Sequence, residues 1–328
     1  MKKRIGIVYG GYSGEAEVSR KSATMILNNI DRDKYEPVEI LVEKSDIKAH
    51  LKNGFSTVDL NDFSYQNGNT RIKPDVCLII VHGTPGEDGK LQGYFDMIGM
   101  PYTTGSVMNT SLTFSKAFTN NLLKYLGYNS AQGVYLQSLH PSNMAEIEQK
   151  LRYPVIVKPN EGGSSLGVSL VKEHAKLESA LEQAFDVDKA VLIEEFIEGP
   201  EYSCGVVNTK EGLVALAITE IRTQKPFFDY KAKYEYDQTE EITPAVMPEH
   251  LYKKCQEISK EIYNHFNCSG VARVDYRLRG EDFYVIEINT VPGLSEKSIV
   301  PQQAEAIGIS KKELVTMMIE SVNLKGKR

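Results

Sequence analysis

The 328-residue chain is poor in cysteine, and its four cysteines, Cys77, Cys204, Cys255 and Cys268, form no CxxC pair. Cys77 lies in the apolar run DVCLIIV and Cys204 in another strand-like run, so we expect buried structural thiols rather than reactive ones. The chain also lacks an excess of positive charge, since 38 Lys and Arg face 44 Asp and Glu, a net charge of −6. This balance argues against a nucleic-acid or anionic-membrane partner.

Long apolar runs are missing too. No run approaches the length of a transmembrane helix. The N-terminus, MKKRIGIVYGG, is basic and then apolar, but its apolar stretch, residues 5–9, is too short for the central region of a signal peptide. The sequence therefore predicts a cytoplasmic protein with no membrane partner.

Two common nucleotide-binding signatures are absent as well. The Walker pattern, GxxxxGK followed by Ser or Thr, occurs nowhere in the chain. The N-terminal motif Gly10-Gly11-Tyr12-Ser13-Gly14 does not have the GxGxxG spacing of dinucleotide-binding proteins, which disfavours a dehydrogenase.

What is present is the composition of a globular protein with a sizeable core, 41% hydrophobic and 25% charged, and the length predicts two or three domains. Residues 1–105 alternate between predicted strands, at 5–9, 38–42 and 76–81, and helices, the first with Ser13 as its predicted N-cap. This alternation indicates a parallel α/β domain, which binds ligands beyond the carboxyl ends of its strands. Both polar motifs of the region, GGYSGEAEVS and HGTPGEDG, directly follow strands.

Two further units are predicted. The second, residues 106–190, has a helix around 115–126 and a strand at 154–158, and the third, residues 191–328, begins with the strand AVLIEEF. Within the third unit, residues 223–245 are polar and aromatic and lack periodicity. An ordered loop of this length is typical of a lid or a binding loop.

The most informative stretch is GVARVDYRLRGEDFYVIEINTVPG, residues 270–293. Two runs with strand-like alternation, 271–278 and 283–288, flank a turn at 279–282, which predicts a β-hairpin. In such a hairpin Asp275 and Glu287 lie opposite one another, within one step of register.

Asn289 lies two residues beyond Glu287, so it shares a face with Glu287, Asp275 and the cation Arg273. Mg²⁺ prefers oxygen ligands and is usually held by one or two carboxylates plus substrate phosphates. The alternative is a solvated polar face of an antiparallel sheet. The apolar Val-Ile-Glu-Ile core, followed directly by Asn-Thr and Pro-Gly, favours a metal–nucleotide site.

The glycine-rich segment from Lys158 to Gly167 joins two strand-like pieces. Its Gly and Ser residues let a loop close over an anion and offer N–H groups and hydroxyls to phosphate oxygens, while Lys158 adds a positive charge. The alternative, a simple hairpin turn, is the commoner structure for such a segment alone. The metal–nucleotide hairpin in the same chain favours a phosphate loop.

The apolar strand that begins at Val191 passes into an acidic bend with Glu194, Glu195 and Glu201. A strand edge can offer backbone groups to an adenine, and carboxylates can bond amino or ribose groups. A polar strand end without a ligand is the alternative.

In order and spacing, these motifs resemble those of ATP-grasp ligases, and specifically of the D-alanine–D-alanine ligase family. The resemblance extends from Gly10 to Pro301 and is carried by GGYSGEAEVS, HGTPGEDG with LQG, SKAFT, VIVKPNEGGSSLGVS, VLIEEFIEGPEYS, DYKAKY, ARVDY, and EINTVPG with SIVP. It implies an N-terminal parallel α/β domain followed by two α+β domains that clamp ATP between them.

The resemblance also implies roles for residues that bind ATP, which is a substrate here. In family members, lysines contact the phosphates, the SSLG loop closes over them, and two glutamates bond the adenine amino group and the ribose. The implied ATP-binding residues are Lys116, Lys158, Ser164, Ser165, Glu194, Glu195 and Glu201. The implied ligands of two Mg²⁺ or Mn²⁺ ions are Asp275, Glu287 and Asn289.

For the amino acids, the resemblance implies that Glu15 binds the ammonium group of the first D-alanine and that His82 lies near it. Ser298 and Ile299 would lie at the second D-alanine, with the serine bonding its carboxylate. Arg273 would neutralise charge that develops on the transferred phosphoryl group and the acyl centre.

A network of Glu15, Ser164 and Tyr234 would fix the closed geometry of the site, again by resemblance. Taken alone, several of these side chains are also compatible with purely structural roles. Glu15 can be a favourable acid in the first turn of a helix, His82 can be structural, and Tyr234 can serve packing only.

The implied activity is ATP-dependent ligation of two D-alanines to D-alanyl-D-alanine, through a D-alanyl phosphate, for peptidoglycan precursor synthesis. D-Lactate or D-serine as the second substrate, and another ATP-grasp carboxylate–amine ligase, remain alternatives. A regulatory module that has lost catalysis is disfavoured because the implied metal ligands, Arg273 and both lysines are all present. Family members are commonly homodimers, so we expect a homodimer.

The chain departs from the family pattern near the second substrate. Many members read PGMTxxS, whereas this chain has Pro292-Gly293-Leu294-Ser295-Glu296-Lys297-Ser298. Leu keeps the volume of Met and Ser keeps a hydroxyl, so we expect the fold to be retained. The sequence predicts no role for the Glu296-Lys297 pair.

Overall fold

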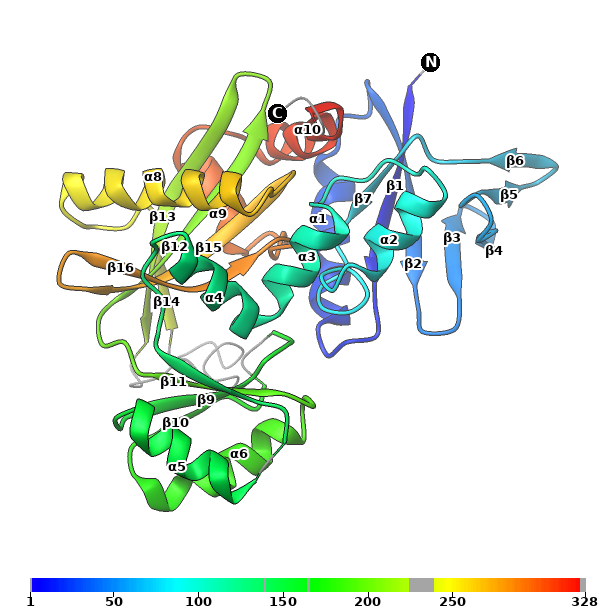
Figure 1. Ribbon diagram of the computed structural model, residues 1–328. Helices are drawn as coiled ribbons and strands as arrows, with labels where there is room; N and C mark the ends of the chain where they lie inside the picture. Colours follow the sequence, from blue (N-terminus) through cyan, green and yellow to red (C-terminus); the bar gives the residue numbers. More distant parts are fainter. Residues whose placement is uncertain (1, 139, 164–165, 224–238, 325–328) are drawn as a thin grey trace.

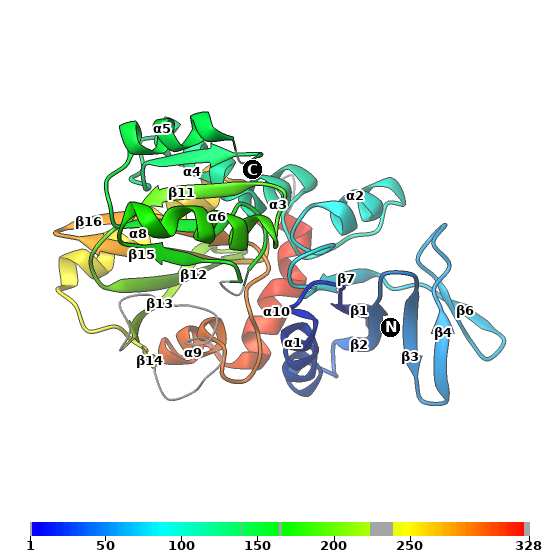
Figure 2. The same cartoon turned by 90° about the horizontal axis from the view of Figure 1, so that it is seen from below.

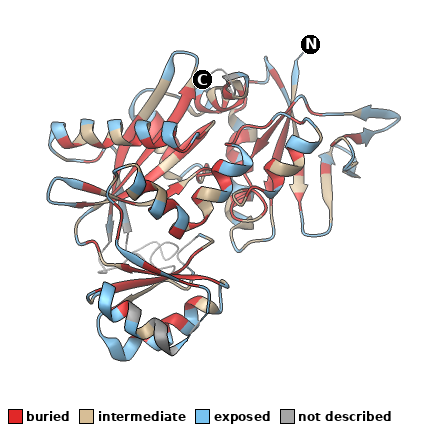
Figure 3. Ribbon diagram, in the orientation of Figure 1, coloured by how far each residue is buried: buried red, intermediate tan, exposed pale blue. Residues whose placement is uncertain are grey.

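The computed structural model describes residues 2–138, 140–163, 166–223 and 239–324. Within these ranges the strands form three larger sheets and one small one, and helices pack on each of the larger sheets (Figure 1). Buried residues concentrate on the strands and on the helix faces turned towards them (Figure 3). The predicted α/β fold class is confirmed.

The N-terminal sheet has the strand order β4-β3-β2-β1-β7. Its strands are β1 (Lys3–Gly10), β2 (Tyr35–Val42), β3 (Ile47–Leu51), β4 (Gly54–Thr57) and β7 (Val76–Ile79). β1 pairs in parallel with both β2 and β7, as predicted, and β1 is apolar because it is buried between them. The antiparallel edge formed by β3 and β4 was not predicted.

Helices follow the two strands that carry the polar motifs: α1 (Ala16–Asn29) after β1 and α2 (Lys90–Met97) after β7. The prediction of Ser13 as the N-cap of α1 was wrong, because Glu15 occupies that position. The Ser13 hydroxyl instead accepts a hydrogen bond from the Glu15 N–H at 3.3 Å and donates one to the carbonyl of His82 at 2.8 Å. Ser13 therefore joins the two polar motifs.

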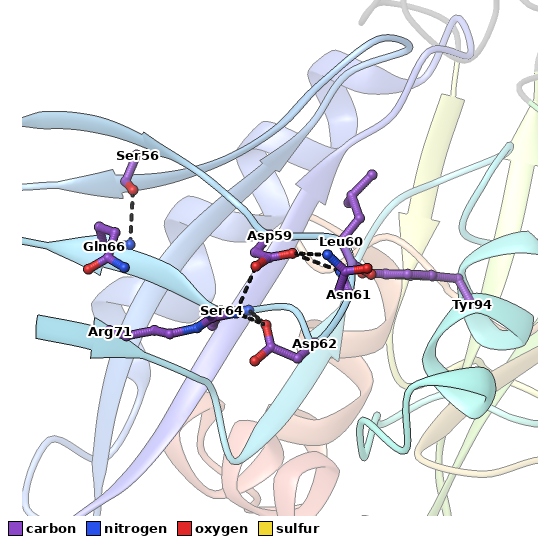
Figure 4. A network of polar contacts seen from close by, with 9 residues as sticks. All are labelled: Ser56, Asp59, Leu60, Asn61, Asp62, Ser64, Gln66, Arg71 and Tyr94. Atoms are coloured by element: carbon purple, nitrogen blue, oxygen red, sulfur yellow. Dashed lines mark hydrogen bonds and ion pairs between the residues drawn. The ribbon is translucent and has the colours of Figure 1, made fainter.

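A small hairpin of β5 (Tyr65–Asn67) and β6 (Thr70–Ile72) projects from the N-terminal sheet. Arg71 anchors it by donating to Ser64 Oγ at 2.7 Å, and Tyr94 of α2 donates to a backbone carbonyl of the same loop at 2.8 Å. Figure 4 shows the network, formed by Ser56, Asp59, Leu60, Asn61, Asp62, Ser64, Gln66, Arg71 and Tyr94. These contacts stabilise the hairpin and do not reach the cavities described below.

The central sheet has the strand order β10-β9-β11-β8. Its elements are β8 (Gly133–Leu136), α5 (Pro141–Lys150), β9 (Val155–Pro159), β10 (Ser169–Val171), η1 (His174–Lys176), α6 (Leu177–Phe185) and β11 (Val191–Glu195). We predicted that β11 begins the third unit, but it pairs with β8 and β9 in this sheet. Strand pairing over such separations depends on tertiary contacts that a single strand does not encode.

The C-terminal sheet is antiparallel, with the strand order β14-β13-β12-β15-β16. Its strands are β12 (Glu201–Thr209), β13 (Gly212–Thr223), β14 (Thr239–Ile242), β15 (Val271–Arg279) and β16 (Asp282–Asn289). The helices around it are α3 (Val107–Phe114), α4 (Lys116–Tyr125), α8 (Glu249–His265), α9 (Ile299–Ala306) and α10 (Lys311–Ser321), followed by η2 (Val322–Leu324).

These helices connect the sheets. α8 packs on one face of β12 and β13, and α9 packs on the other, where α10 also contacts α1 of the N-terminal unit (Figure 2). α3 and α4, which we grouped with the second unit, pack against β16. Among the described residues, no helix has both the length and the apolar character needed to cross a membrane.

Candidate active site

Two adjoining cavities lie where the three larger sheets meet. We call them the first cavity, of about 470 Å³, and the second cavity, of about 800 Å³. Both sizes suit small-molecule ligands. Residues that line both cavities are Glu15, Phe114, Lys116, Gly162, Gly163, Glu201, Ile286 and Glu287. Because so many residues are shared, the two cavities form one continuous cleft.

The first cavity contains an apolar slot between the central and C-terminal sheets. Ile156 of β9 and Ile286 of β16 line it, together with Phe196 and Ile197 just beyond β11. Such a slot suits a flat, largely apolar ring. Glu194 and Glu195, which end β11, lie at its margin, as does Glu201 at the start of β12.

A buried ion pair lies beside this slot. Lys158 Nζ is 2.5 Å from Glu194 Oε2, and each side chain is only 7% exposed. Asn120 of α4 donates to the other carboxylate oxygen of Glu194. Because Lys158 bonds one carboxylate oxygen of Glu194 and Asn120 bonds the other, the carboxylate keeps a fixed position in the cavity wall.

A second buried amine, that of Lys116, points at the glycine-rich segment. Its Nζ donates to the carbonyl of Gly162 at 2.7 Å, and Asn160 Oδ1 accepts from the N–H of Ala117 at 3.0 Å. Burial lowers the pKa of Lys116, while the negative charge of Glu287 opposes that shift. Lys116 and Lys158 therefore present two amines to the first cavity.

The predicted hairpin is present, and its predicted register is confirmed. Asp275 of β15 lies opposite Glu287 of β16, and Arg273 lies opposite Asn289. The register shifts directly after Asp275, where an irregularity bends the pair. The turn contains Gly280, whose φ of 65° is a conformation that favours glycine.

Asp275 is the most heavily bonded of these residues. Its Oδ1 accepts from Ser203 Oγ at 2.6 Å and from Arg273 Nε at 2.8 Å. Its Oδ2 accepts from Arg273 Nη2 at 2.6 Å and from Asn289 Nδ2 at 3.0 Å. Burial lowers the pKa of Arg273, but the attraction of Asp275 and then of Glu287 outweighs burial and holds that pKa above its usual value.

The chemistry of this donor set fits a hard divalent cation. Asp275, Glu287 and Asn289 all line the second cavity, and all carry oxygen donors. No cluster of three or more His, Cys, Asp or Glu suited to a metal occurs among the described residues. A site with two carboxylates and one amide is still adequate for Mg²⁺, because substrate phosphates complete its coordination.

Glu15 and the glycine-rich segment are brought together across the cleft. A Cβ atom on Gly163 would lie 2.7 Å from both carboxylate oxygens of Glu15, so a side chain there would displace that carboxylate. A Cβ atom on Gly83, in the HGTPGEDG motif, would lie 2.7 Å from Ser13 Oγ. Three sequence motifs that are far apart in the chain therefore meet at one wall.

His82 is buried and joins the N-terminal unit to the segment after β16. Burial lowers its pKa, and Nδ1 lies 2.8 Å from the carbonyl of Val291, which fixes the proton on Nδ1 of a neutral ring. Nε2 then accepts from the hydroxyl of Ser22 at 3.2 Å, and that hydroxyl accepts from the N–H of Leu294 at 3.1 Å. Both ring nitrogens therefore hold the wall of the second cavity in place.

Glu87 is a site residue that sequence reasoning missed. It lines the second cavity and accepts from the N–H of Gly83 at 2.7 Å. Burial, followed by the negative charge of Glu15, raises the pKa of Glu87 to about 8. Its place in the HGTPGEDG motif after a predicted strand was the available signal, but nothing in the sequence places it near Glu15.

The other end of the second cavity is formed by the start of α9. Ser298 is the N-cap of α9, Ile299 is its first residue, and both line the cavity. The hydroxyl of Ser298 accepts from the N–H of Ser295 at 2.9 Å. Glu296, which had no predicted role, lies 2.5 Å from Lys311 Nζ of α10, so it ties this loop to the C-terminal helices.

Some predicted site residues lie outside the described residues. Ser164 and Ser165 of the glycine-rich segment and Tyr234 are among them. Of the predicted lid, 223–245, only residues 223 and 239–245 are described. The remaining predicted site residues, from Glu15 to Ile299, all line one of the two cavities or both.

Comparisons with known proteins agree with the geometry. Residues 4–106 match the family model for the D-ala D-ala ligase N-terminus, and residues 122–320 match the model for the C-terminus. The chain is 40% identical over 323 residues to the D-alanine–D-alanine ligase of Bacteroides fragilis, which covers 98% of this chain and 99% of that protein.

Solved structures are similar as well. A D-Ala:D-Ser ligase from Enterococcus faecalis has a TM-score of 0.89 and 29% identity, covering 98% of this chain and 100% of that chain. A D-alanine–D-alanine ligase from Bacillus anthracis, complexed with ATP, has a TM-score of 0.80 and 32% identity, covering 99% and 98%. The resemblance found in the sequence is thus confirmed, and the chain belongs to the D-alanine–D-alanine ligase family.

Proposed function

We propose that this protein joins two D-alanine molecules in an ATP-dependent reaction, through a D-alanyl phosphate, to supply D-alanyl-D-alanine for peptidoglycan precursors. The observation that carries this proposal is the continuity of the two cavities, with Glu15, Lys116 and Glu287 at their junction. A phosphoryl group must pass from a nucleotide in the first cavity to a carboxylate in the second cavity. Such a transfer needs cations and metal-binding carboxylates at the same place.

ATP occupies the first cavity in this proposal. Its adenine fits the slot between Ile156 and Ile286, and the two buried amines face its phosphates. The related Bacillus anthracis ligase, which is complexed with ATP, supports ATP as the nucleotide. The residues proposed to bind ATP are Lys116, Lys158, Ser164, Ser165, Glu194, Glu195 and Glu201.

Asp275, Glu287 and Asn289 are proposed to hold two Mg²⁺ or Mn²⁺ ions. When bound, the ions neutralise phosphate charge and stabilise the charge that develops during transfer. Arg273 adds a guanidinium on the same face, held by two hydrogen bonds to Asp275. A guanidinium fixed in this way needs no reorganisation when charge develops on the phosphoryl oxygens or on the acyl centre.

The two amino acids occupy the second cavity. Glu15 is proposed to bind the ammonium group of the first D-alanine, with His82 in the adjoining wall, and Ser298 and Ile299 to bind the second D-alanine. Glu15 and the start of α9 both line this cavity. Ser164 and Tyr234 are proposed to complete the network around Glu15.

The chemistry requires that water be kept out. A carboxylate is a poor acylating agent, so ATP first converts it to an acyl phosphate. The amine of the second D-alanine then attacks that carbonyl, phosphate leaves as the C–N bond forms, and the amine loses a proton. Because water would hydrolyse the acyl phosphate, a closing segment is needed, and residues 223–245 are the candidate lid.

D-Serine or D-lactate as the second substrate is the competing proposal. A similar structure is named a D-Ala:D-Ser ligase, so the fold alone does not select the second substrate. We expect D-alanine to be preferred when D-alanine, D-serine and D-lactate compete. We also expect Tyr234→Phe to increase depsipeptide relative to dipeptide formation, and an unchanged ratio would remove Tyr234 from the specificity determinants.

The test of the main proposal is a product assay. Incubation with ATP, Mg²⁺ and D-alanine should release ADP and phosphate in a one-to-one ratio with D-alanyl-D-alanine. ATP turnover without dipeptide would refute the proposal. A mixed product in which D-alanyl-D-serine dominates would replace it with the competing one.

We further propose a homodimer in the cytoplasm, where ATP is available. Met97, Val107 and Met108 are exposed apolar residues on α2 and α3 that a second copy would cover. Sedimentation of the wild type and of Met108→Glu tests the dimer, and cell fractionation tests the location.

The division into domains at 1–105, 106–190 and 191–328 is also a proposal, and the pairing of β11 favours a second boundary beyond Glu195.

A further inference from the structure

The pairing of β12 with β13 contains an irregularity close to the second cavity. The register passes from Cys204↔Ile218 to Val206↔Ala215, so that two residues of β13 lie opposite the single residue Gly205. Such a bulge interrupts the ladder and leaves backbone groups that need other partners.

Gln303 of α9 supplies those partners from one face of the sheet. Its Oε1 accepts from the N–H of Gly205 at 2.9 Å, and its Nε2 donates to the carbonyl of Ser203 at 2.7 Å and to Thr219 Oγ1 at 3.1 Å. The side chain is fully buried, and a Cβ atom on Gly205 would lie 2.8 Å from Oε1. α9 is therefore fixed to the bulge by a buried amide that a side chain at position 205 would displace.

The same bulge is bonded to α8 from the opposite face. Gln256 of α8 donates through Nε2 to the carbonyl of Leu216 at 2.9 Å. Gln256 lines neither the first nor the second cavity. Both glutamines bond one irregularity, Gln303 through three hydrogen bonds and the partly buried Gln256 through one, but only Gln303 stands on a helix that reaches the second cavity.

Gln303 also links the two walls of that cavity. Ser298 and Ile299 precede it on α9 by about one turn and line the cavity. On the sheet side, Gly205 lies opposite Arg273, and Ser203 donates to Asp275. The amide of Gln303 therefore sets the distance between the start of α9 and the strand that carries Arg273 and Asp275.

We propose that Gln303 is a positioning residue for the second substrate: it seats α9 in the β12–β13 bulge and so places Ser298 and Ile299 opposite Arg273. Gln303 touches no substrate and acts only through α9. The kinetic part of this inference rests on the proposed ligase function.

The test compares Gln303→Met with Gln256→Met, which removes an amide that bonds the same bulge from the opposite face of the sheet. Dipeptide formation is measured against D-alanine concentration to separate the two amino-acid sites. Formation of D-alanine hydroxamate, with hydroxylamine attacking the acyl phosphate in place of the second D-alanine, reports the first half-reaction alone. Hydrogen exchange of the α9 amides gives a structural readout that does not depend on activity.

We expect Gln303→Met to lower kcat/KM for the second D-alanine about 10- to 10²-fold, with a higher KM, because misplacing a bound reactant by about 1 Å can lower the rate by about 10²-fold. The rate of hydroxamate formation should stay within about twofold of the wild-type rate, far less than the change expected for dipeptide formation. Exchange of the α9 amides should become faster in Gln303→Met and remain near the wild-type rate in Gln256→Met.

Equal KM changes in the two variants, or unchanged α9 exchange in Gln303→Met, would overturn the inference. If Gln303→Met does not fold, Gly205→Ala is the second variant, because its methyl group displaces the side-chain amide of Gln303 without removing it. The same changes in KM and in α9 exchange are then expected, and their absence would also overturn the inference. If the wild type forms no dipeptide, the proposed ligase function fails, and the exchange comparison alone still decides whether Gln303 seats α9.

Discussion

Replacing Arg273 by lysine tests the site most directly, because the change keeps the charge and removes the geometry. The Arg273 guanidinium donates to Asp275 twice, at 2.8 and 2.6 Å, and a lysine amine can keep at most one of these bonds in place. Losing one hydrogen bond to a charged group costs about 1.5–3 kcal/mol. Asp275 keeps its bonds from Ser203 and Asn289, so we expect Arg273→Lys to fold.

The catalytic effect should be larger than the effect on stability. Removing one fixed donor from a developing negative charge typically lowers kcat by about 10²–10³, or about 2.7–4 kcal/mol. We expect a fall of this size in kcat for dipeptide formation, with the KM for ATP changed by less than about tenfold, since the interaction is made mainly in the transition state.

Arg277 provides a matched control four residues along the same strand. It is as buried as Arg273, with side chains 15% and 16% exposed, and it pairs with Glu201 at 2.8 Å. Arg277→Lys should raise the KM for ATP through Glu201 and leave kcat within about tenfold, because Arg277 lies at the first cavity only. A kcat for Arg273→Lys near that of the wild type, or an equal fall in both variants, would refute the reasoning.

Other predictions follow from buried groups. The pKa of Glu87 is raised to about 8 from 4.5, so between these values the folded state holds a proton that the unfolded state releases, and the free energy of unfolding should fall as pH rises from 5 to 9. In urea denaturation, Glu87→Gln should make the free energy of unfolding less dependent on pH. The same pH dependence in the variant and the wild type would contradict this prediction. Glu194→Gln leaves Lys158 without its buried carboxylate, so we expect the free energy of unfolding to fall by about 3–5 kcal/mol. ATP binding measured by calorimetry should also be weaker. A variant as stable as the wild type would show that the ion pair is dispensable. All four cysteines are buried, so a thiol reagent should label none of them in the native protein and all of them in urea, and rapid native labelling would contradict their structural role.

Local pattern was enough to predict several elements. The alternation around the Arg279–Asp282 turn predicted the hairpin and placed Asp275 opposite Glu287 within one step of register, because the side-chain period of a strand is two. The turn alone would pair Asp275 with Ile286, and the irregularity directly after Asp275 brings Glu287 opposite it. The parallel pairing of β1 with β2 and β7 followed from alternating strands and helices in the same way. Ser13 shows the limit: it has the chemistry of an N-cap, but its hydroxyl bonds the backbone of His82 in another motif.

The sequence by itself determined the family, the hairpin and most residues that line the cleft, because these depend on residue types at short spacings. Tertiary structure decided that β11 pairs in the central sheet and that Gln303 bonds the β12–β13 bulge. It also brought Glu87 near enough to Glu15 for the charge of Glu15 to raise the pKa of Glu87. These contacts join residues that lie about 30 to 100 positions apart in the chain. Their chemistry arises from burial and neighbouring charge, which exist only once the three sheets have closed around the cleft.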